Sequence, residues 1–207
     1  MSTVNVLIAG VGGQGVVSAA RLLAQAVLDS GRKVIVGQTF GASQRGGSVH
    51  TSVRIGDEVH GPLIGLKMAD FLLAFDPYES LRYLQFLAPT GIVIVNDQPD
   101  VPVRDQLAKT FPPLEEAWQI LKAKTKGLYR LSATRIARQI ATRYGGRVDI
   151  TNTVILGAAT AVEDFPVDVG MLKRTLERRF KSKALSMNLE ALEAGRDQIL
   201  TQRGRPG

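Results

Sequence analysis

Cysteine is absent from all 207 residues of the chain, and only two histidines, His50 and His60, are present. Without a thiolate, the chain can form no disulfide, hold no thiolate-bound zinc or iron–sulfur cluster, and use no cysteine nucleophile. A metal site would have to rely on carboxylates, and the sequence shows no carboxylate-rich metal loop. Both histidines fall in or beside a strand-like stretch, so we interpret them as structural residues and predict no metal site.

Aromatic residues make up only 6% of the chain, and no apolar run is long enough to cross a bilayer. The amino-terminal stretch also lacks the basic region of a signal peptide. We therefore expect a cytoplasmic protein with no membrane partner. The formal charge of +7 favours acidic partners, which could be nucleic acid, phosphorylated cofactors or an acidic subunit. The scarcity of aromatic stacking platforms and the lack of a nucleic-acid-binding motif argue against nucleic acid.

The chain alternates between short apolar runs and amphipathic helical patterns. The apolar runs are nearly continuous, as is typical of strands buried on both faces of a parallel sheet, and they cover residues 3–9, 33–36, 69–75, 91–96 and 128–131. Helices are predicted at residues 14–30, 77–87, 114–123, 132–144, 152–162, 169–180 and 185–201. This order predicts a Rossmann-like, doubly wound and mostly parallel α/β sheet with helices on both faces and a helical C-terminal third.

Two strands need separate comment. Residues 33–36 are expected to follow the first strand and helix in a right-handed βαβ unit. Residues 49–55 alternate between apolar and polar side chains, which predicts a half-exposed strand. A turn at Gly56-Asp57 and a short return strand at residues 58–60 are expected after it.

Three polar residues stand where helices are predicted to begin. Asp76, Ser132 and Asp168 each precede a helical pattern and are expected to cap it through the side-chain oxygen. No composition shift or internal repeat divides the chain. We therefore expect one α/β domain over residues 1–201 and a flexible tail over residues 202–207.

The first predicted strand is followed by a glycine-rich turn that reads GVGGQG and contains Gly10-x-Gly12-x-x-Gly15. Glycines in this position permit positive φ angles and a close approach to a ligand. The start of the next helix offers N–H groups without intrahelical partners, which suits a phosphate or a carboxylate. A purely structural role, in which the glycines only allow the helix to pack on the strand, remains the alternative.

The same spacing occurs in dinucleotide-binding proteins, but one part of their site is missing here. NAD binding requires an acid at the end of the second strand, and residues 36–39 contain none. An NADP-dependent reductase remains an alternative, because Ser43, Gln44 and Arg45 follow that strand and could meet a 2′-phosphate. Against that alternative, the sequence offers no convincing set of proton donors.

A second glycine-rich stretch, residues 41–49, reads GASQRGGSV and follows the second predicted strand. Loops at the carboxyl ends of parallel strands share one edge of the sheet, so this loop should lie near the glycine turn. Apart from Gln44, the neighbours of Arg45 in the sequence are small, and Ser43 and Ser48 add hydroxyl groups. We predict an anion-binding, cofactor-facing edge formed by Gly10, Gly12, Gly13, Gln14, Gly15, Ser43, Arg45, Gly46, Gly47 and Ser48.

The two glycine motifs together resemble the gamma-type subunits of the 2-oxoacid:ferredoxin oxidoreductases, and within these the small subunit of the indolepyruvate enzymes. Residues 69–82, 152–158 and 188–195 extend the resemblance, which covers residues 3–196. It implies a part in the oxidative decarboxylation of a 2-oxoacid, of which indolepyruvate and other arylpyruvates are the implied examples, to an acyl-CoA with ferredoxin as electron acceptor.

The resemblance also implies a division of labour between subunits. Thiamine diphosphate, Mg²⁺ and the iron–sulfur clusters would belong to a catalytic partner subunit, and this chain would bind no cofactor alone. The chain would then be inactive by itself and would touch ferredoxin only indirectly. The glycine-rich edge would contact CoA or dock the partner, and both roles remain open, as does a pure interaction module. We assign no catalytic acid or base to the chain.

Overall fold

The computed structural model describes residues 3–38, 47–99, 111–146 and 149–203. Its centre is a six-stranded sheet with the order β2-β3-β1-β4-β5-β6. The strands are β1 (Val4–Val11), β2 (Val34–Gln38), β3 (Ser48–Ile55), β4 (Ala69–Ala74), β5 (Leu87–Asn96) and β6 (Gly127–Leu131). β1, β4, β5 and β6 run parallel to one another, while β3 is antiparallel to both β1 and β2. The predicted α/β class and the mostly parallel sheet are confirmed.

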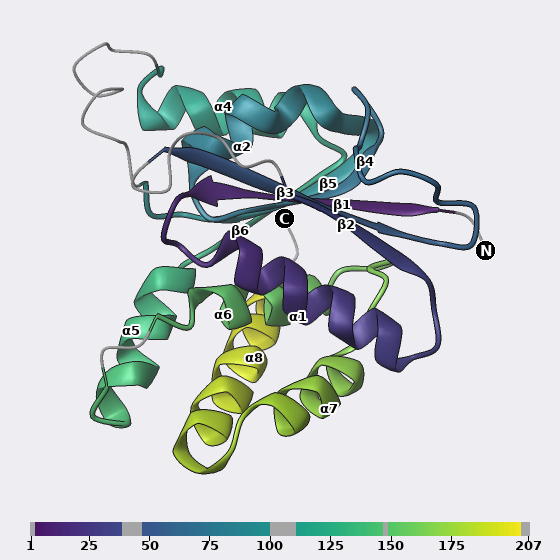
Figure 1. Ribbon diagram of the computed structural model, residues 1–207. Coiled ribbons are helices and arrows are strands. Elements are labelled where there is room, and N and C mark those ends of the chain that lie inside the picture. The colour runs from purple at the N-terminus through teal and green to yellow at the C-terminus, as the bar shows by residue number, and fades with distance from the viewer. Residues whose placement is uncertain (1–2, 39–46, 100–110, 147–148, 204–207) are drawn as a thin grey trace.

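Helices cover both faces of the sheet, as predicted (Figure 1). One face carries α2 (Pro77–Tyr83), the 3₁₀ turn η1 (Leu84–Phe86) and α4 (Leu114–Lys124). The other face carries α1 (Val16–Asp29) together with the helical C-terminal third. That third consists of α5 (Ala133–Arg143), α6 (Thr151–Ala159), α7 (Val169–Arg179) and α8 (Ser182–Arg203). Residues 204–207 of the predicted tail lie outside the described residues. No described helix is both long and apolar enough to span a membrane.

The position of β3 departs from the prediction. β2 is not the neighbour of β1, because β3 turns back after β2 and inserts between them, pairing Ala9 with His50 and Val36 with Val53. As an interior strand, β3 has hydrogen-bonded neighbours on both sides, and Thr51, Ser52 and Val53 are buried. The strand predicted at residues 49–55 is confirmed as β3, but its predicted half-exposure is wrong, because none of its residues is exposed. Alternation describes the two faces of a strand and does not reveal that both are covered.

The predicted return strand at residues 58–60 is also absent; those residues belong to the connection between β3 and β4. The Arg54 guanidinium shapes that connection by donating hydrogen bonds to the carbonyl oxygens of Gly61 and Leu63, at 2.9 and 3.1 Å. A side chain thus satisfies backbone carbonyls just after the residues where the return strand was predicted.

Two of the three predicted caps are confirmed. Asp76 accepts from the N–H groups of Tyr78 and Glu79 at the start of α2, and Asp168 accepts from Met171 N–H at 2.8 Å at the start of α7. Ser132 precedes α5, but its hydroxyl makes no capping bond and donates instead to Asp97 Oδ2 at 2.6 Å. This hydroxyl donates to a carboxylate and accepts from the Arg135 guanidinium, and neither partner is a backbone N–H group.

Helices α6 and α8 approach each other through two glycines. A Cβ added to Gly157 would lie 2.0 Å from the carbonyl oxygen of Leu192, and one added to Gly195 would lie 2.0 Å from that of Val154. Real Cβ atoms do not approach backbone oxygens so closely, so only glycine allows this contact. It fixes α6, whose N-terminus forms part of the site described next.

Candidate functional site

The glycine turn joins the carboxyl end of β1 to α1 and is shaped by backbone angles that favour glycine. Gly13 has φ +104° and Gly15, the residue before α1, has φ +94°. A Cβ on Gly10 would lie 2.7 Å from the Gln14 side-chain oxygen and 2.9 Å from Phe75, so this glycine is required by packing. That same Gln14 oxygen accepts from Val11 N–H at 2.8 Å and braces the turn.

The two glycine motifs meet at one hydrogen bond. Gly12 N–H donates to the carbonyl oxygen of Gly47 at 2.8 Å, directly before β3 begins at Ser48. The predicted proximity of the motifs is therefore observed at Gly47, and β3 adds a second reason for it. The antiparallel β3 starts beside the end of β1, so the loop between β2 and β3 begins and ends on the carboxyl edge of the sheet. Ser43, Arg45 and Gly46 lie outside the described residues.

This hydrogen bond decides which backbone groups could bind an anion. The N–H of Gly12 is used by Gly47, and the N–H of Gln14 donates to Val11 at 3.1 Å. The first intrahelical bond of α1 runs from Ala19 N–H to Gly15, so the N–H groups of residues 16–18 have no helical acceptor. An anion at this edge would therefore be bound by the first turn of α1 and by Gly13, where an added Cβ would meet no described residue within 4 Å.

The Ser48 side chain contacts two residues of α2, on the face of the sheet opposite to α1. Its hydroxyl donates to Glu79 Oε2 and lies 2.9 Å from the Tyr83 hydroxyl. The Glu79 side chain is only 2% exposed and also accepts from Arg82 Nε at 3.1 Å. Burial raises the pKa of Glu79, while its bonds to Ser48 and Arg82 oppose that rise. A role for Ser48 toward a ligand stays a prediction, because this hydroxyl already has two protein partners.

Aromatic rings complete the cluster around Ser48. The His50 ring packs on Tyr83 with centroids 4.6 Å apart, and Phe86 follows at 6.3 Å. Burial lowers the pKa of His50 and raises the pKa of Tyr83, and both shifts favour the neutral form of the group. Sequence reasoning missed this cluster, because Glu79 in the first turn of α2 looks like an ordinary solvent-facing helix acid.

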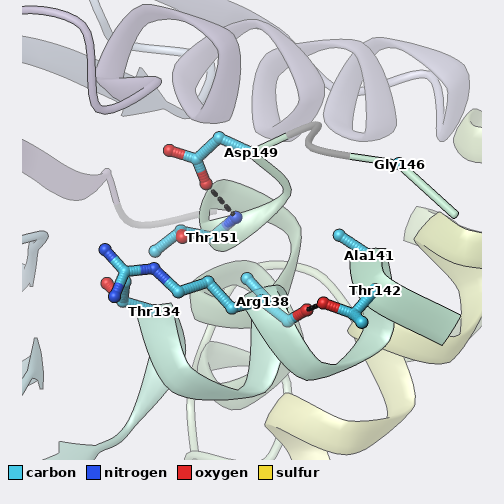
Figure 2. A pocket seen from close by; sticks show the side chains of 8 residues that line it. Thr134, Arg138, Ala141, Thr142, Gly146, Asp149 and Thr151 are labelled. Carbon is cyan, nitrogen blue, oxygen red and sulfur yellow. Dashed lines mark hydrogen bonds between the residues drawn. The ribbon is translucent and has the colours of Figure 1, made fainter.

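A hollow of about 460 Å³ lies between α5 and the start of α6 (Figure 2). Arg138 contributes its guanidinium from α5, and Asp149 lies on the opposite wall, where it accepts from Thr151 N–H at 2.9 Å. The remaining lining is small, formed by Thr134, Ala137, Ala141, Thr142, Gly146 and Thr151. Its volume falls in the usual range of small-molecule sites. No sequence signal distinguished Arg138 from the other arginines of α5.

The hollow and the glycine turn lie on the same edge of the sheet. Asn152, next to the lining residue Thr151, has its Cβ 3.5 Å from the place that a Cβ on Gly15 would occupy. On the other side, the Asn96 amide at the end of β5 donates to Thr134 Oγ1 and accepts from Thr134 N–H. The carboxyl ends of β1 and β5 thus position the turn and the hollow, the usual place of ligand sites in open α/β sheets.

The structure also bears on the NADP-dependent alternative and on metal binding. A dinucleotide site would set the tip of the second strand beside the first, but here β3 separates β2 from β1 by two strand spacings, roughly 10 Å. This geometry disfavours an NADP-dependent reductase. Within the described residues, no three His, Asp or Glu side chains gather as metal ligands.

The chain is similar to known proteins over almost its whole length. Residues 5–198 match the family described as pyruvate ferredoxin/flavodoxin oxidoreductase. The indolepyruvate oxidoreductase subunit IorB of Pyrococcus horikoshii is 38% identical over 94% of this chain and 95% of its own length. The corresponding IorB subunit of Thermococcus kodakarensis is 36% identical, with the same two coverages.

A solved structure supports the same assignment. The pyruvate oxidoreductase subunit PORC of Thermotoga maritima superimposes with a TM-score of 0.71 at 25% identity, over 95% of this chain and 97% of that one. The chain belongs to the pyruvate ferredoxin/flavodoxin oxidoreductase family, as a small subunit of the 2-oxoacid:ferredoxin oxidoreductase type.

Proposed function

We propose that this chain supports the oxidation of indolepyruvate, or a related arylpyruvate, by docking on a catalytic subunit and shaping the access of CoA. The substrate class is supported by the identity to two IorB subunits, whose names specify indolepyruvate. Thiamine diphosphate, Mg²⁺ and iron–sulfur clusters would lie on the partner, where they supply decarboxylation and electron transfer to ferredoxin. The absence of cysteine agrees with a chain that holds no cluster.

The observation that carries the CoA part of the proposal is the junction between Gly12 and Gly47. It brings the second glycine motif to the first turn of α1, where N–H groups without helical acceptors favour a phosphate. CoA carries several phosphates, and the adjacent hollow provides the Arg138 guanidinium for a second anionic contact. Ser43, Arg45 and Gly46 belong to the same motif and are proposed to face the same ligand.

Co-expression with the catalytic subunit tests the whole proposal. The purified complex should reduce a viologen dye with indolepyruvate in a reaction that requires both CoA and thiamine diphosphate. The chain alone should show no activity, and the partner alone should show much less activity than the complex. Full activity of the partner without this chain would overturn the proposal.

The CoA contact can be tested separately by binding. Isothermal titration of the complex with CoA should give a weaker affinity for Arg45→Ala and for Arg138→Ala than for the wild type. Arg135→Ala removes another exposed arginine of α5 that does not line the hollow, and it serves as the matched control. Equal CoA affinity in all four proteins would show that this edge contacts only protein.

A further inference from the structure

Exposed apolar side chains gather at the opposite edge of the sheet, just before β4. Leu63, Leu66 and Met68 are 67, 62 and 49% exposed. In the described part of the chain, only Leu28 and Leu200 are comparably exposed large apolar residues, and these lie singly on α1 and α8. Scattered apolar residues are normal on a protein surface, but three within six positions are a feature that requires a reason.

The segment that carries these side chains is fixed to the body of the protein. Its carbonyls at Gly61 and Leu63 accept from Arg54, and Met68 N–H and Lys67 N–H donate to Phe86 and Gln85 at 2.9 and 3.1 Å. Asn5 adds a hydrogen bond to the Met68 carbonyl at 3.0 Å. The leucines are therefore presented to solvent by an anchored backbone, since a loop without these bonds could fold its apolar side chains inward.

Lys67 shows that this presentation has an energetic cost. It has φ +58°, a left-handed conformation that non-glycine residues seldom adopt, and it lies between the exposed Leu66 and Met68. Such strain persists only where surrounding contacts impose it, and it occurs preferentially at functional positions. Here the two backbone bonds to Gln85 and Phe86 impose it.

A shallow groove of about 330 Å³ continues the apolar surface. Its lining includes Leu84, Leu87, Ala88 and Pro89 between the two cations Lys67 and Lys124, and no carboxylate. No ion pair within the described residues involves either ammonium group. Apart from Gln85, the described lining of the groove therefore consists of apolar residues and two lysines, and its only charges are positive.

We propose that residues 63–68 and this groove, together called the amino-edge patch, bind the catalytic partner subunit through an apolar segment flanked by acidic side chains. Aromatic or aliphatic anchors would occupy the groove, and the carboxylates would meet Lys67 and Lys124. A second copy of this chain is disfavoured as the occupant, because it brings the same formal charge of +7. The inference rests on the proposed function and specifies which surface performs the docking.

Quantitative binding of the full chain to the purified, cofactor-loaded catalytic subunit tests the proposal. Leu66→Asp places a charge in the centre of the patch, and we expect the Kd to rise by at least about tenfold. Leu28→Asp introduces the same charge at an exposed leucine elsewhere and should change the Kd by less than about twofold. Thermal unfolding of both variants verifies that each is folded.

A second variant, Lys67→Gly, is not expected to destabilise the fold. The substitution removes one of the two lysine charges of the groove and relieves the left-handed strain, because glycine accepts positive φ. It should weaken binding about threefold and reduce its dependence on salt, as expected for a lost charge pair across an interface. Unchanged binding by both Leu66→Asp and Lys67→Gly would overturn the assignment of this surface.

The outcomes distinguish failure of the proposed docking surface from failure of the proposed function. If the wild-type chain activates the partner and both Leu66→Asp and Lys67→Gly bind as tightly as the wild type, the patch is wrong while the proposed function stands. If the wild type neither binds nor activates the partner, both are wrong. If Leu66→Asp instead abolishes self-association of the isolated chain, the occupant is a second copy and the proposal is overturned.

Discussion

The two edges of the central sheet are built for different kinds of contact. At the carboxyl edge, the glycine turn and the hollow beside Arg138 expose backbone N–H groups, hydroxyls and a guanidinium around small side chains. At the amino edge, the amino-edge patch exposes leucines and lysines on an anchored segment. The carboxyl edge offers polar groups to a small anionic ligand, whereas the amino edge offers an apolar area suited to a protein.

This contrast implies that ligand contact and subunit docking can be altered one at a time. The strands separate the two edges by their full length, and β1 alone spans eight residues, roughly 26 Å. Substitutions at one edge should therefore change CoA kinetics without changing association, and those at the other edge should do the reverse, because distant sites are usually additive.

The largest effect is expected from Gly157→Ala, which tests whether α6 supports the carboxyl edge. The added methyl would meet the Leu192 carbonyl at 2.0 Å and force α6 away from α8. We expect a loss of about 3 kcal/mol or more in the free energy of unfolding, measured by urea denaturation. Gly61→Ala is the control, since a Cβ there meets nothing within 4 Å, and equal stabilities would refute the close contact.

The next effect concerns Gly13→Ala in the assembled complex. The substitution strains a residue at φ +104° without a steric clash, so the turn should shift and the KM for CoA should rise about tenfold, equivalent to roughly 1.4 kcal/mol. Gly31→Ala carries the same backbone penalty at φ +80° beyond the end of α1. An equal rise in KM for both variants would mean that the effect is general destabilisation and not ligand contact.

A third prediction uses the buried Glu79, which connects α2 to Ser48. Burial raises its folded-state pKa, so the carboxyl contributes most to stability at low pH, and this contribution is lost as the pH rises through the folded pKa. Glu79→Gln should therefore become more stable relative to the wild type as the pH rises from 4 to 7, as measured by chemical denaturation. The exposed Glu116→Gln is the control, and a difference between wild type and Glu79→Gln that does not vary with pH would contradict the prediction.

The smallest effect should follow from Asp168→Ala, which touches neither edge. Loss of the cap on Met171 N–H at the start of α7 should cost about 1 kcal/mol of stability. Neither the KM for CoA nor the Kd for the partner should change, and a change in either would show that the edges respond to overall stability. Thermal unfolding and the two functional assays together provide the measurement.

Much of the fold follows from local signals in the sequence. The buried strands, the glycine turn and the caps Asp76 and Asp168 depend on residues within a few positions of each other, and they are confirmed. The insertion of β3 between β1 and β2 was not predictable in this way, because the choice between neighbours depends on pairing energies across the sheet. The cap predicted at Ser132 is wrong because its hydroxyl bonds to Asp97 and Arg135, and the contact with Asp97, 35 residues away, has no local signal.

The candidate site likewise has parts that could be predicted from the sequence and parts that could not. The meeting of the two glycine motifs could be predicted, since it depends on the shared edge of a sheet. The contact of Ser48 with Glu79 and Tyr83 could not, because it joins segments 31 and 35 residues apart. The hollow beside Arg138 depends on the spacing of α5 and α6, which no periodicity encodes.

The antiparallel direction of β3 has a consequence for how this protein could be re-engineered. Because β3 returns beside β2, the chain between Gln38 and Ser48 connects two neighbouring, paired strands. The entropic cost of closing a loop grows only slowly with its length, by about 0.6 kcal/mol per doubling. The segment can therefore be exchanged for a longer or shorter one without altering the sheet, which makes it a natural place to graft a new ligand specificity.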